Sequence, residues 1–295
     1  MSDNKPNIFI VSDVITIFDK SINELTTIKQ SLSSEPGMCT WNLKSTYTYI
    51  YSIFETTLYQ TYYRILIAFP ESIKNYKIDN IGDIISSYSF MTPLVEVVAS
   101  SFARNFAYGK IKDIFKDYND VVKIGLNIKD CKFLDELEKY KCERNLLVHQ
   151  GTCPDKLDYI KVVERIDFII EILEIIKNKF RLKYNEYTKI NLIKKSWFYV
   201  FGDKVPFESC FILNKDGELY SVNSEYIDRR TRSLSHSEKV LIVLFMTNYS
   251  SWVLDNAMRI KDLCTFASLS QITKNKIGFI LELFHRYPTL LLENI

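Results

Sequence analysis

The sequence is poor in the residues that most often build metal centres and tight turns. Only three histidines occur among 295 residues, and none of the six cysteines forms a Cys-x-x-Cys pair or lies at ligand spacing from two histidines. The sequence therefore predicts no zinc site, and we expect neither a metal nor another cofactor. Eight glycines and seven prolines suit a helical protein, and a hydrophobic content of 47% is ample for a core.

Long apolar runs and a strong net charge are also absent. No stretch reaches the roughly 18 to 20 apolar residues that cross a bilayer. The nearest candidate, residues 47–69, is interrupted by Glu55, Gln60 and Arg64, so we expect a buried helix there and no membrane partner. The formal net charge is only +2, so any contact with RNA requires a local basic patch. Neither a basic n-region nor a signal cleavage site begins the sequence, which predicts a cytoplasmic protein with free thiols.

Apolar residues recur at helical spacing along most of the chain. Thr92 and Pro93 are a typical N-cap and first residue of a helix, whereas residues 71–91 suggest irregular structure. We expect helices at residues 11–31, 42–69, 92–118, 127–150, 157–180 and 239–287. Six tyrosines lie in the second of these helices, and their spread around its axis favours packing between helices over stacking on nucleic-acid bases.

The pattern changes near Trp197, where aromatic and aliphatic residues alternate with turn residues. Asn214-Lys215-Asp216-Gly217 is typical of a hairpin turn, so a small β element is expected at residues 197–223, after a linker at 184–196. The fold class expected is mainly α, with a C-terminal α+β extension in which a hairpin precedes further helices. The expected divisions are residues 1–36, 37–185 and 190–295.

One segment, residues 141–151, breaks the pattern of its own helix. Arg144 falls in the middle of the apolar stripe, where an arginine must be paired or must face a wet cleft. Asn145 and His149 are neighbours at i, i+4, and Gly151 is expected to end the helix. The stripe predicted for this helix comprises Phe133, Leu137, Tyr140, Leu147 and Val148.

The chemistry of these side chains favours a phosphodiester substrate. The Arg144 guanidinium matches two phosphate oxygens, and the His149 imidazole can exchange a proton near neutral pH. No carboxylate pair, Cys-His pair or metal cluster accompanies them, which favours attack of a ribose 2′-hydroxyl on its own 3′-phosphate in RNA. This reaction needs both a base and an acid, and a symmetric dimer that apposes two copies of the set would supply both.

The pattern Arg144-Asn145-x-x-x-His149, followed by Gly151, resembles the motif of the HEPN superfamily, all-helical nucleotide-binding or ribonuclease domains common in bacterial toxins and defence proteins. Over residues 40–185 the resemblance implies a HEPN-like four-helix bundle and a metal-independent endoribonuclease site shared by a homodimer. It implies that Arg144 stabilises the phosphate, that Asn145 has an orienting role in the site and that His149 transfers a proton. A toxin or antiviral abortive-infection effector is the implied role, with an antitoxin or defence-system protein as a further candidate partner.

Other basic residues are candidates for contacting RNA. They are Arg104, Lys141, Arg229, Arg230 and Arg232. Arg104-Asn105 echoes the motif without a following histidine, and Arg104 could line the same cleft. Residues 228–237 are expected to form a mobile basic loop, for which a merely solvated charge run is the alternative.

Two other classes of function stay open. A non-catalytic HEPN-like adaptor would use Arg144 in an ion pair and His149 as a helix cap, so that both only stabilise the fold or dimer. A nucleic-acid-binding regulatory protein would act through the C-terminal helices, where residues 263–285 faintly suggest a helix-turn-helix.

Overall fold

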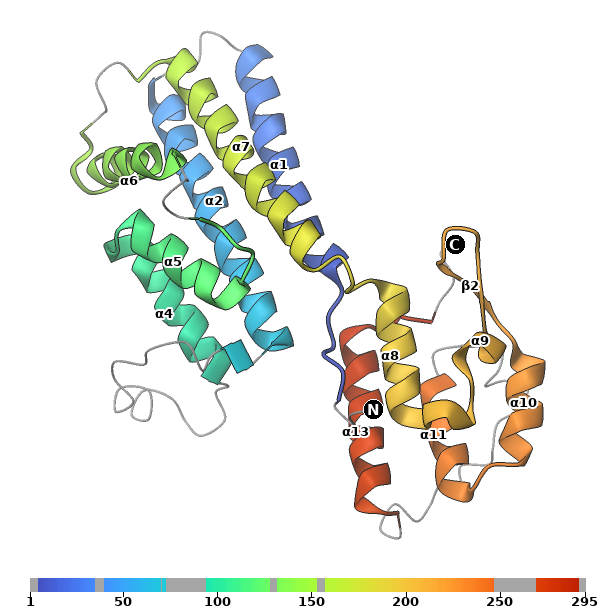
Figure 1. The fold of residues 1–295 in the computed structure, drawn as a ribbon. Coiled ribbons are helices and arrows are strands. Elements are labelled where there is room, and N and C mark those ends of the chain that lie inside the picture. Colours follow the sequence, from blue (N-terminus) through green and yellow to red (C-terminus); the bar gives the residue numbers. More distant parts are fainter. Residues whose placement is uncertain are drawn as a thin grey trace. The chain divides into compact units, whose positions relative to one another are not determined.

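Helices make up most of the chain, together with one small antiparallel sheet (Figure 1). The computed structural model describes residues 5–34, 40–69, 71–72, 94–127, 132–152, 157–246 and 269–291. Contacts divide the chain into two compact units, Val11–Asn185 and Met1–Ile10 with Glu186–Ile295. Among the helices within the described ranges, none combines the length and the apolar character needed to cross a membrane.

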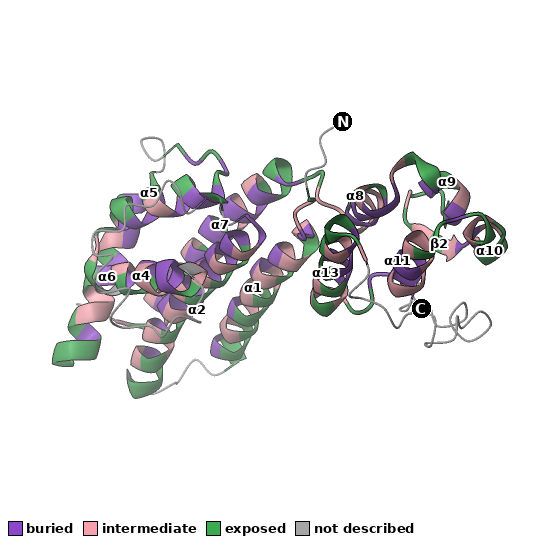
Figure 2. Cartoon of the chain, turned by 90° about the horizontal axis from the view of Figure 1, so that it is seen from below, coloured by how far each residue is buried: buried purple, intermediate pink, exposed green. Residues whose placement is uncertain are grey.

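The unit at residues 11–185 is arranged around one long helix. Its helices are α1 (Val11–Ser34), α2 (Thr40–Ala68), α4 (Leu94–Tyr108), α5 (Ile111–Val122), α6 (Phe133–Gln150) and α7 (Tyr159–Lys183). Helix α2 contacts all five others, and α1 and α7 run beside it (Figure 1). Buried residues gather where α1, α2 and α7 meet (Figure 2). Polar and apolar residues of α2 are not separated into two clear faces, because most of the surface of this helix is covered by its neighbours.

The six tyrosines of α2 differ in burial, and Tyr49 is 51% exposed. Tyr47, Tyr51 and Tyr62 are fully buried, which confirms for these three that packing was the better interpretation. Tyr59 and Tyr63 are only half-buried, and they lie one turn apart on α2.

Two expected features of this unit differ in the structure. Residues 1–36 were expected to form a separate N-terminal helix, but α1 packs against α2 and α7 through an apolar face that includes Phe18 and Leu25. The expected helix 92–118 is two helices, because it breaks at Gly109 and Lys110 has an extended backbone. Gly109 still donates its N–H to the Asn105 carbonyl at 2.6 Å. The break allows α5 to turn back against α2, α4 and α6.

The motif helix α6 begins at Phe133, six residues later than expected. Residues 123–127 carry no regular structure, and the Leu126 N–H donates to the Asn119 side chain at 2.9 Å. The end of the helix was predicted correctly. Gly151 has φ 65°, and its N–H donates to the Leu147 carbonyl at 3.1 Å. A left-handed backbone at this position favours glycine and stops the helix.

The other unit builds a core around Trp197. Its indole N–H donates to the Val205 carbonyl at 2.7 Å, and its ring contacts Phe201, Phe211 and Phe245. The elements are α8 (Lys189–Phe201), η2 (Gly202–Lys204), α9 (Phe207–Cys210), β1 (Phe211–Leu213), β2 (Leu219–Val222), α10 (Ser224–Arg232), α11 (His236–Met246) and α13 (Gln271–Arg286).

The predicted hairpin is confirmed, although its flanks differ. Strands β1 and β2 pair antiparallel, with Phe211 opposite Val222, and Gly217 has φ 78° in the turn. The segment 197–201, expected to be β, is the end of α8. The expected linker 184–196 contains the start of that helix, which Thr188 caps by accepting from the Asn191 N–H. Aromatic residues at this end of α8 are used for packing around Trp197, which propensity alone does not reveal.

Candidate functional site

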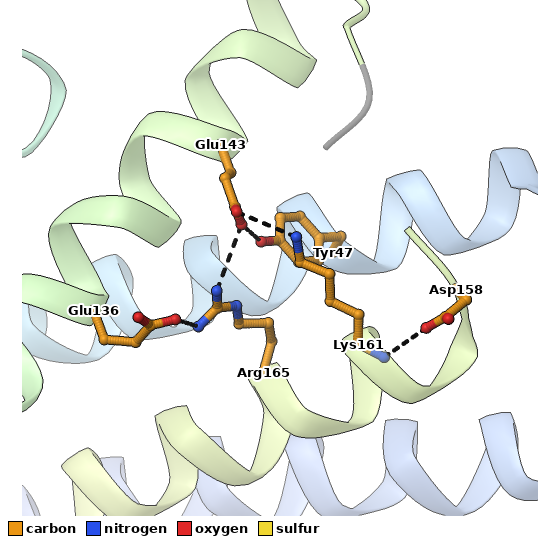
Figure 3. A network of polar contacts seen from close by, with 6 residues as sticks. All are labelled: Tyr47, Glu136, Glu143, Asp158, Lys161 and Arg165. Atoms are coloured by element: carbon orange, nitrogen blue, oxygen red, sulfur yellow. Dashed lines mark hydrogen bonds and ion pairs between the residues drawn. The ribbon is translucent and has the colours of Figure 1, made fainter. Parts of the chain in front are cut away.

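A network of charged side chains holds the motif helix against its neighbours (Figure 3). Glu143 of α6 accepts hydrogen bonds from the Tyr47 hydroxyl of α2 and from Lys161 of α7, the latter at 3.2 Å. Arg165 of α7 lies 3.5 Å from Glu143 and 2.5 Å from Glu136. The network therefore links three helices at the middle of α6.

Burial and hydrogen bonds together set the ionisation of this network. Burial, reinforced by the Glu143 carboxylate, raises the pKa of Tyr47 well above its usual value. Burial opposes ionisation of Glu143 as well, but hydrogen bonds from Tyr47 and Lys161 outweigh it and lower the pKa of that carboxyl. Glu143 is therefore an anion at neutral pH, and Tyr47 is a neutral donor to it.

Arg144 turns toward α2, as an arginine inside an apolar stripe must. Its side chain is 20% exposed, and Nη2 lies 3.5 Å from the Glu55 carboxylate of α2. Nη1 donates to the side-chain oxygen of Asn145 at 3.0 Å, and the guanidinium lies 5.6 Å from the Tyr51 ring centroid. Within the described ranges, the Arg144 Nε and the Tyr51 hydroxyl are buried without a hydrogen-bond partner.

Glu55 is a member of this cluster that sequence reasoning did not identify. Burial raises the pKa of its carboxyl, and the opposing effects of Arg144 and Lys141 are smaller. The signal was present in the sequence, since Glu55 interrupts the apolar run at residues 47–69. An acidic residue on a central helix needs a cation, and Arg144 is that cation.

His149 lies on the exposed side of the last turn of α6. Leu146 and Val148 are also exposed, by 45% and 51%, so the expectation that Val148 belongs to the buried stripe is wrong. The buried face of α6 ends at Leu147. Cys142, Leu146 and His149 follow one another at i, i+4 and i+7, so they form one exposed strip along the helix.

Arg144 and His149 do not converge within one copy of the chain. Five residues separate them, which corresponds to about 140° around the helix axis. Arg144 faces α2, whereas His149 is exposed to solvent. Asn145 lies beside Arg144 and makes the only contact between members of the motif that the described residues record.

The other candidate RNA contacts have different surroundings. Lys141 is buried and donates to the Gly109 carbonyl, and this placement disfavours the predicted contact with RNA. Arg104 is exposed on α4. Arg229 lies 3.5 Å from Glu225, one turn away on α10. The hydrogen bond from Lys141 to the Gly109 carbonyl stabilises the turn between α4 and α5.

The expected mobile basic loop is largely helical. Arg229, Arg230 and Arg232 lie on α10, and Arg230 donates to the Lys204 carbonyl at 2.9 Å. The helix forms because Asn223 caps it by accepting from the Tyr226 N–H. These arginines belong to a different unit from Arg144.

Part of the suspected helix-turn-helix lies outside the described residues, which resume at residue 269. Thr273 is buried at the start of α13, and Lys276 donates to the Val200 carbonyl at 2.7 Å. In the polar run Thr273-Lys274-Asn275-Lys276 at this helix start, Thr273 and Lys276 therefore stabilise their own unit, which weakens the case for DNA reading by them.

The described residues contain no group of three or more His, Cys, Asp or Glu side chains that could hold a metal ion. No protein-family model, curated protein or solved structure matches this chain.

Proposed function

We propose that this chain is a metal-independent endoribonuclease of the HEPN type, whose site combines Arg144, Asn145 and His149 from two copies. Its biological role would be that of a toxin or an antiviral abortive-infection effector. In this proposal the helices at residues 40–185 correspond to the HEPN-like bundle, and the substrate is RNA.

The observation that carries the proposal is the exposed strip of Cys142, Leu146 and His149 on the motif helix. Leu146, which is 45% exposed, would supply apolar area to a contact between copies beside His149. Because Arg144 and His149 diverge by about 140° on their own helix, one copy cannot readily present both to a single phosphate. A twofold contact that sets this strip of one copy beside the Arg144 side of the motif helix in the other would bring the histidine of one copy toward the arginine of the other.

The surroundings of Arg144 suit a phosphate ligand. Its 3.5 Å separation from Glu55 is at the outer limit for a hydrogen bond, so an incoming phosphate competes with a weak contact. Asn145 accepts from Nη1 and thereby holds the plane of the guanidinium. Arg144 would stabilise charge on the phosphoryl oxygens as the reaction proceeds.

The proposed reaction needs proton transfer at two oxygens. One His149 takes the proton of the ribose 2′-hydroxyl as its oxygen forms a bond to phosphorus. The other His149, protonated, donates to the 5′-oxygen as the phosphorus–oxygen bond breaks. The products are a 2′,3′-cyclic phosphate and a free 5′-hydroxyl, and no water enters this step.

Cleavage of single-stranded RNA in the presence of EDTA tests the proposal. We expect His149→Ala to lose activity about a hundredfold or more. His285→Ala is the matched control, since His285 is an exposed histidine in the last turn of α13. Products ending in cyclic phosphate support the reaction. Activity that EDTA abolishes, or that survives unchanged in His149→Ala, contradicts it.

Self-association is tested separately with Leu146→Glu. A charge at this exposed position should separate the copies in light scattering and abolish cleavage while leaving helicity unchanged. Leu182→Glu on α7 is the control, because Leu182 is 75% exposed and lies outside the strip. A monomeric Leu146→Glu protein that still cleaves RNA would rule out a shared site.

A non-catalytic adaptor is the second candidate function. The cluster of Arg144, Glu55 and Tyr51 favours it, because these side chains join α6 to α2 whether or not a substrate binds. An adaptor of this kind binds its partners without turnover, and Arg144→Ala should then affect stability alone.

A further inference from the structure

A groove outside the motif runs between α1 and α2. Its volume is about 670 Å³, within the range of small-molecule sites. The two helices run antiparallel, since Thr57 donates to the Ser21 hydroxyl at 2.7 Å and Tyr49 donates to Glu24 at 2.5 Å. The groove is therefore an elongated furrow along two helices of one unit.

A pair of nearly parallel tyrosine rings lines the groove. Tyr59 and Tyr63 line it, and their rings are nearly parallel, with an angle of 13° and centroids 6.2 Å apart. Both are half-buried, and no hydrogen bond of either hydroxyl is recorded within the described part of the chain. Unlike the buried Tyr47 and Tyr51, this pair leaves ring surface accessible to a ligand. Stacking of bases on aromatic rings tolerates any base and suits a single strand.

Cations flank the aromatic pair. Lys20 of α1 and Arg64 of α2 line the groove, both are exposed, and neither has an ion pair among the described residues. Asp13 lies near the Arg64 end and Glu24 near the other, so the groove has no large positive field. This balance disfavours duplex binding through phosphates alone and favours stacking assisted by one or two phosphate contacts.

The groove and the proposed site both involve α2. Tyr59 follows Glu55, the partner of Arg144, by four residues, which is about 6 Å along the helix axis. We propose that the α1–α2 groove binds single-stranded RNA, with bases stacked on Tyr59 and Tyr63 and phosphates on Lys20 and Arg64. The choice of RNA as the ligand rests on the proposed function, whereas the groove is a feature of the structure that does not depend on it.

Fluorescence anisotropy tests the groove with a labelled 2′-O-methyl oligoadenylate, which lacks the attacking hydroxyl and is not cleaved. We expect Tyr59→Leu with Tyr63→Leu to weaken binding about tenfold or more, because loss of the flat rings removes base stacking. Tyr59→Phe with Tyr63→Phe keeps the rings and should bind within about threefold of the wild type.

Salt dependence tests the two cations. Lys20→Glu with Arg64→Glu should reduce the magnitude of the slope of log affinity against log salt by about 1.4. Arg181→Glu with Lys183→Glu is the control, since both residues are exposed at the end of α7. The inference is overturned if the Arg181→Glu, Lys183→Glu control loses as much affinity, or if the Tyr59→Leu, Tyr63→Leu variant binds as well as the wild type. It is also overturned if the two phenylalanine substitutions weaken binding as much as the two leucine substitutions do. Competition by duplex RNA as strong as that by single-stranded RNA would overturn it too.

The outcomes separate the groove from the catalytic proposal. If RNA is cleaved at the motif but the groove variants bind normally, only the groove inference fails. If the groove variants lose binding while the wild type never cleaves RNA, only the catalytic proposal fails.

Discussion

Replacing Arg165 tests how the motif helix is held. The side chain is 10% exposed, it pairs with Glu136 and Glu143, and its guanidinium lies 5.1 Å from the Tyr140 ring centroid. Arg165→Met keeps much of the apolar stem and removes the charge. Glu143 then keeps Tyr47 and Lys161 as hydrogen-bond partners but loses one of its two cations.

The size of the effect follows from the exposure of the partners. Removing one member of a buried ion pair costs about 3 to 5 kcal/mol. Glu136 is 43% exposed and can be solvated by water, and Glu143 keeps Lys161 as a cation. The cost of Arg165→Met should therefore lie below this range. We expect about 2 kcal/mol, including the lost interaction with the Tyr140 ring.

Hydrogen exchange is the appropriate assay, because the chain has two units and one unfolding free energy does not describe both. Amides of α6 and α7 should exchange about thirtyfold faster in Arg165→Met, which is the factor that about 2 kcal/mol corresponds to. Amides of α8, in the other unit, should not change. Arg181→Met provides the control for loss of an exposed arginine on α7.

A double-mutant cycle with Glu143→Gln shows whether the network is the cause. If Glu143 is the carboxylate left unpaired, the double variant should lose about 1 kcal/mol less than the sum of the two single losses. Additive losses, or an Arg165→Met protein that exchanges like Arg181→Met, would refute the reasoning.

Three further predictions concern other parts of the chain. Glu238→Ala should destabilise the C-terminal helices by about 1 kcal/mol at neutral pH, because Lys204 and then Ser235 lower the pKa of Glu238 to about 2. A carboxyl whose pKa is lowered in the folded state stabilises the fold at pH values above its ordinary pKa, and this contribution is lost as pH falls toward the lowered pKa. The difference in exchange protection between Glu238→Ala and the wild type should therefore shrink as pH falls toward 2. Gly151→Ala should cost about 1 kcal/mol at φ 65°, measured by exchange at the end of α6. Peptide mapping after alkylation should find exposed Cys142 labelled and Cys210 protected, since burial raises the pKa of Cys210 to about 12; equal labelling would contradict this.

Periodicity predicted the helices well where one face is buried. The first helix follows from its apolar spacing, and the end of α6 at Gly151 follows from glycine's tolerance of positive φ. The hairpin turn at residues 214–217 was equally readable, because its side chains satisfy the turn locally. These features depend on interactions within a few residues.

The misses depended on distant contacts. Nothing local distinguishes the exposed Val148 from the buried Leu147, because exposure depends on where α2 and α5 stop covering α6. The aromatic end of α8 resembles a strand until its packing around Trp197 is known. Arg144 was correctly expected to turn inward, whereas its pairing with Glu55 spans 89 residues and required the fold.

Mixing subunits tests the shared site most directly. Wild-type chain is refolded together with increasing proportions of the His149→Ala variant, and RNA cleavage in EDTA is measured at constant total protein. If each site needs a histidine from both copies, activity falls as the square of the wild-type fraction, so an equal mixture retains about a quarter. Activity that falls linearly, leaving about half in an equal mixture, would show that one histidine per site suffices and would contradict a site that needs His149 from both copies.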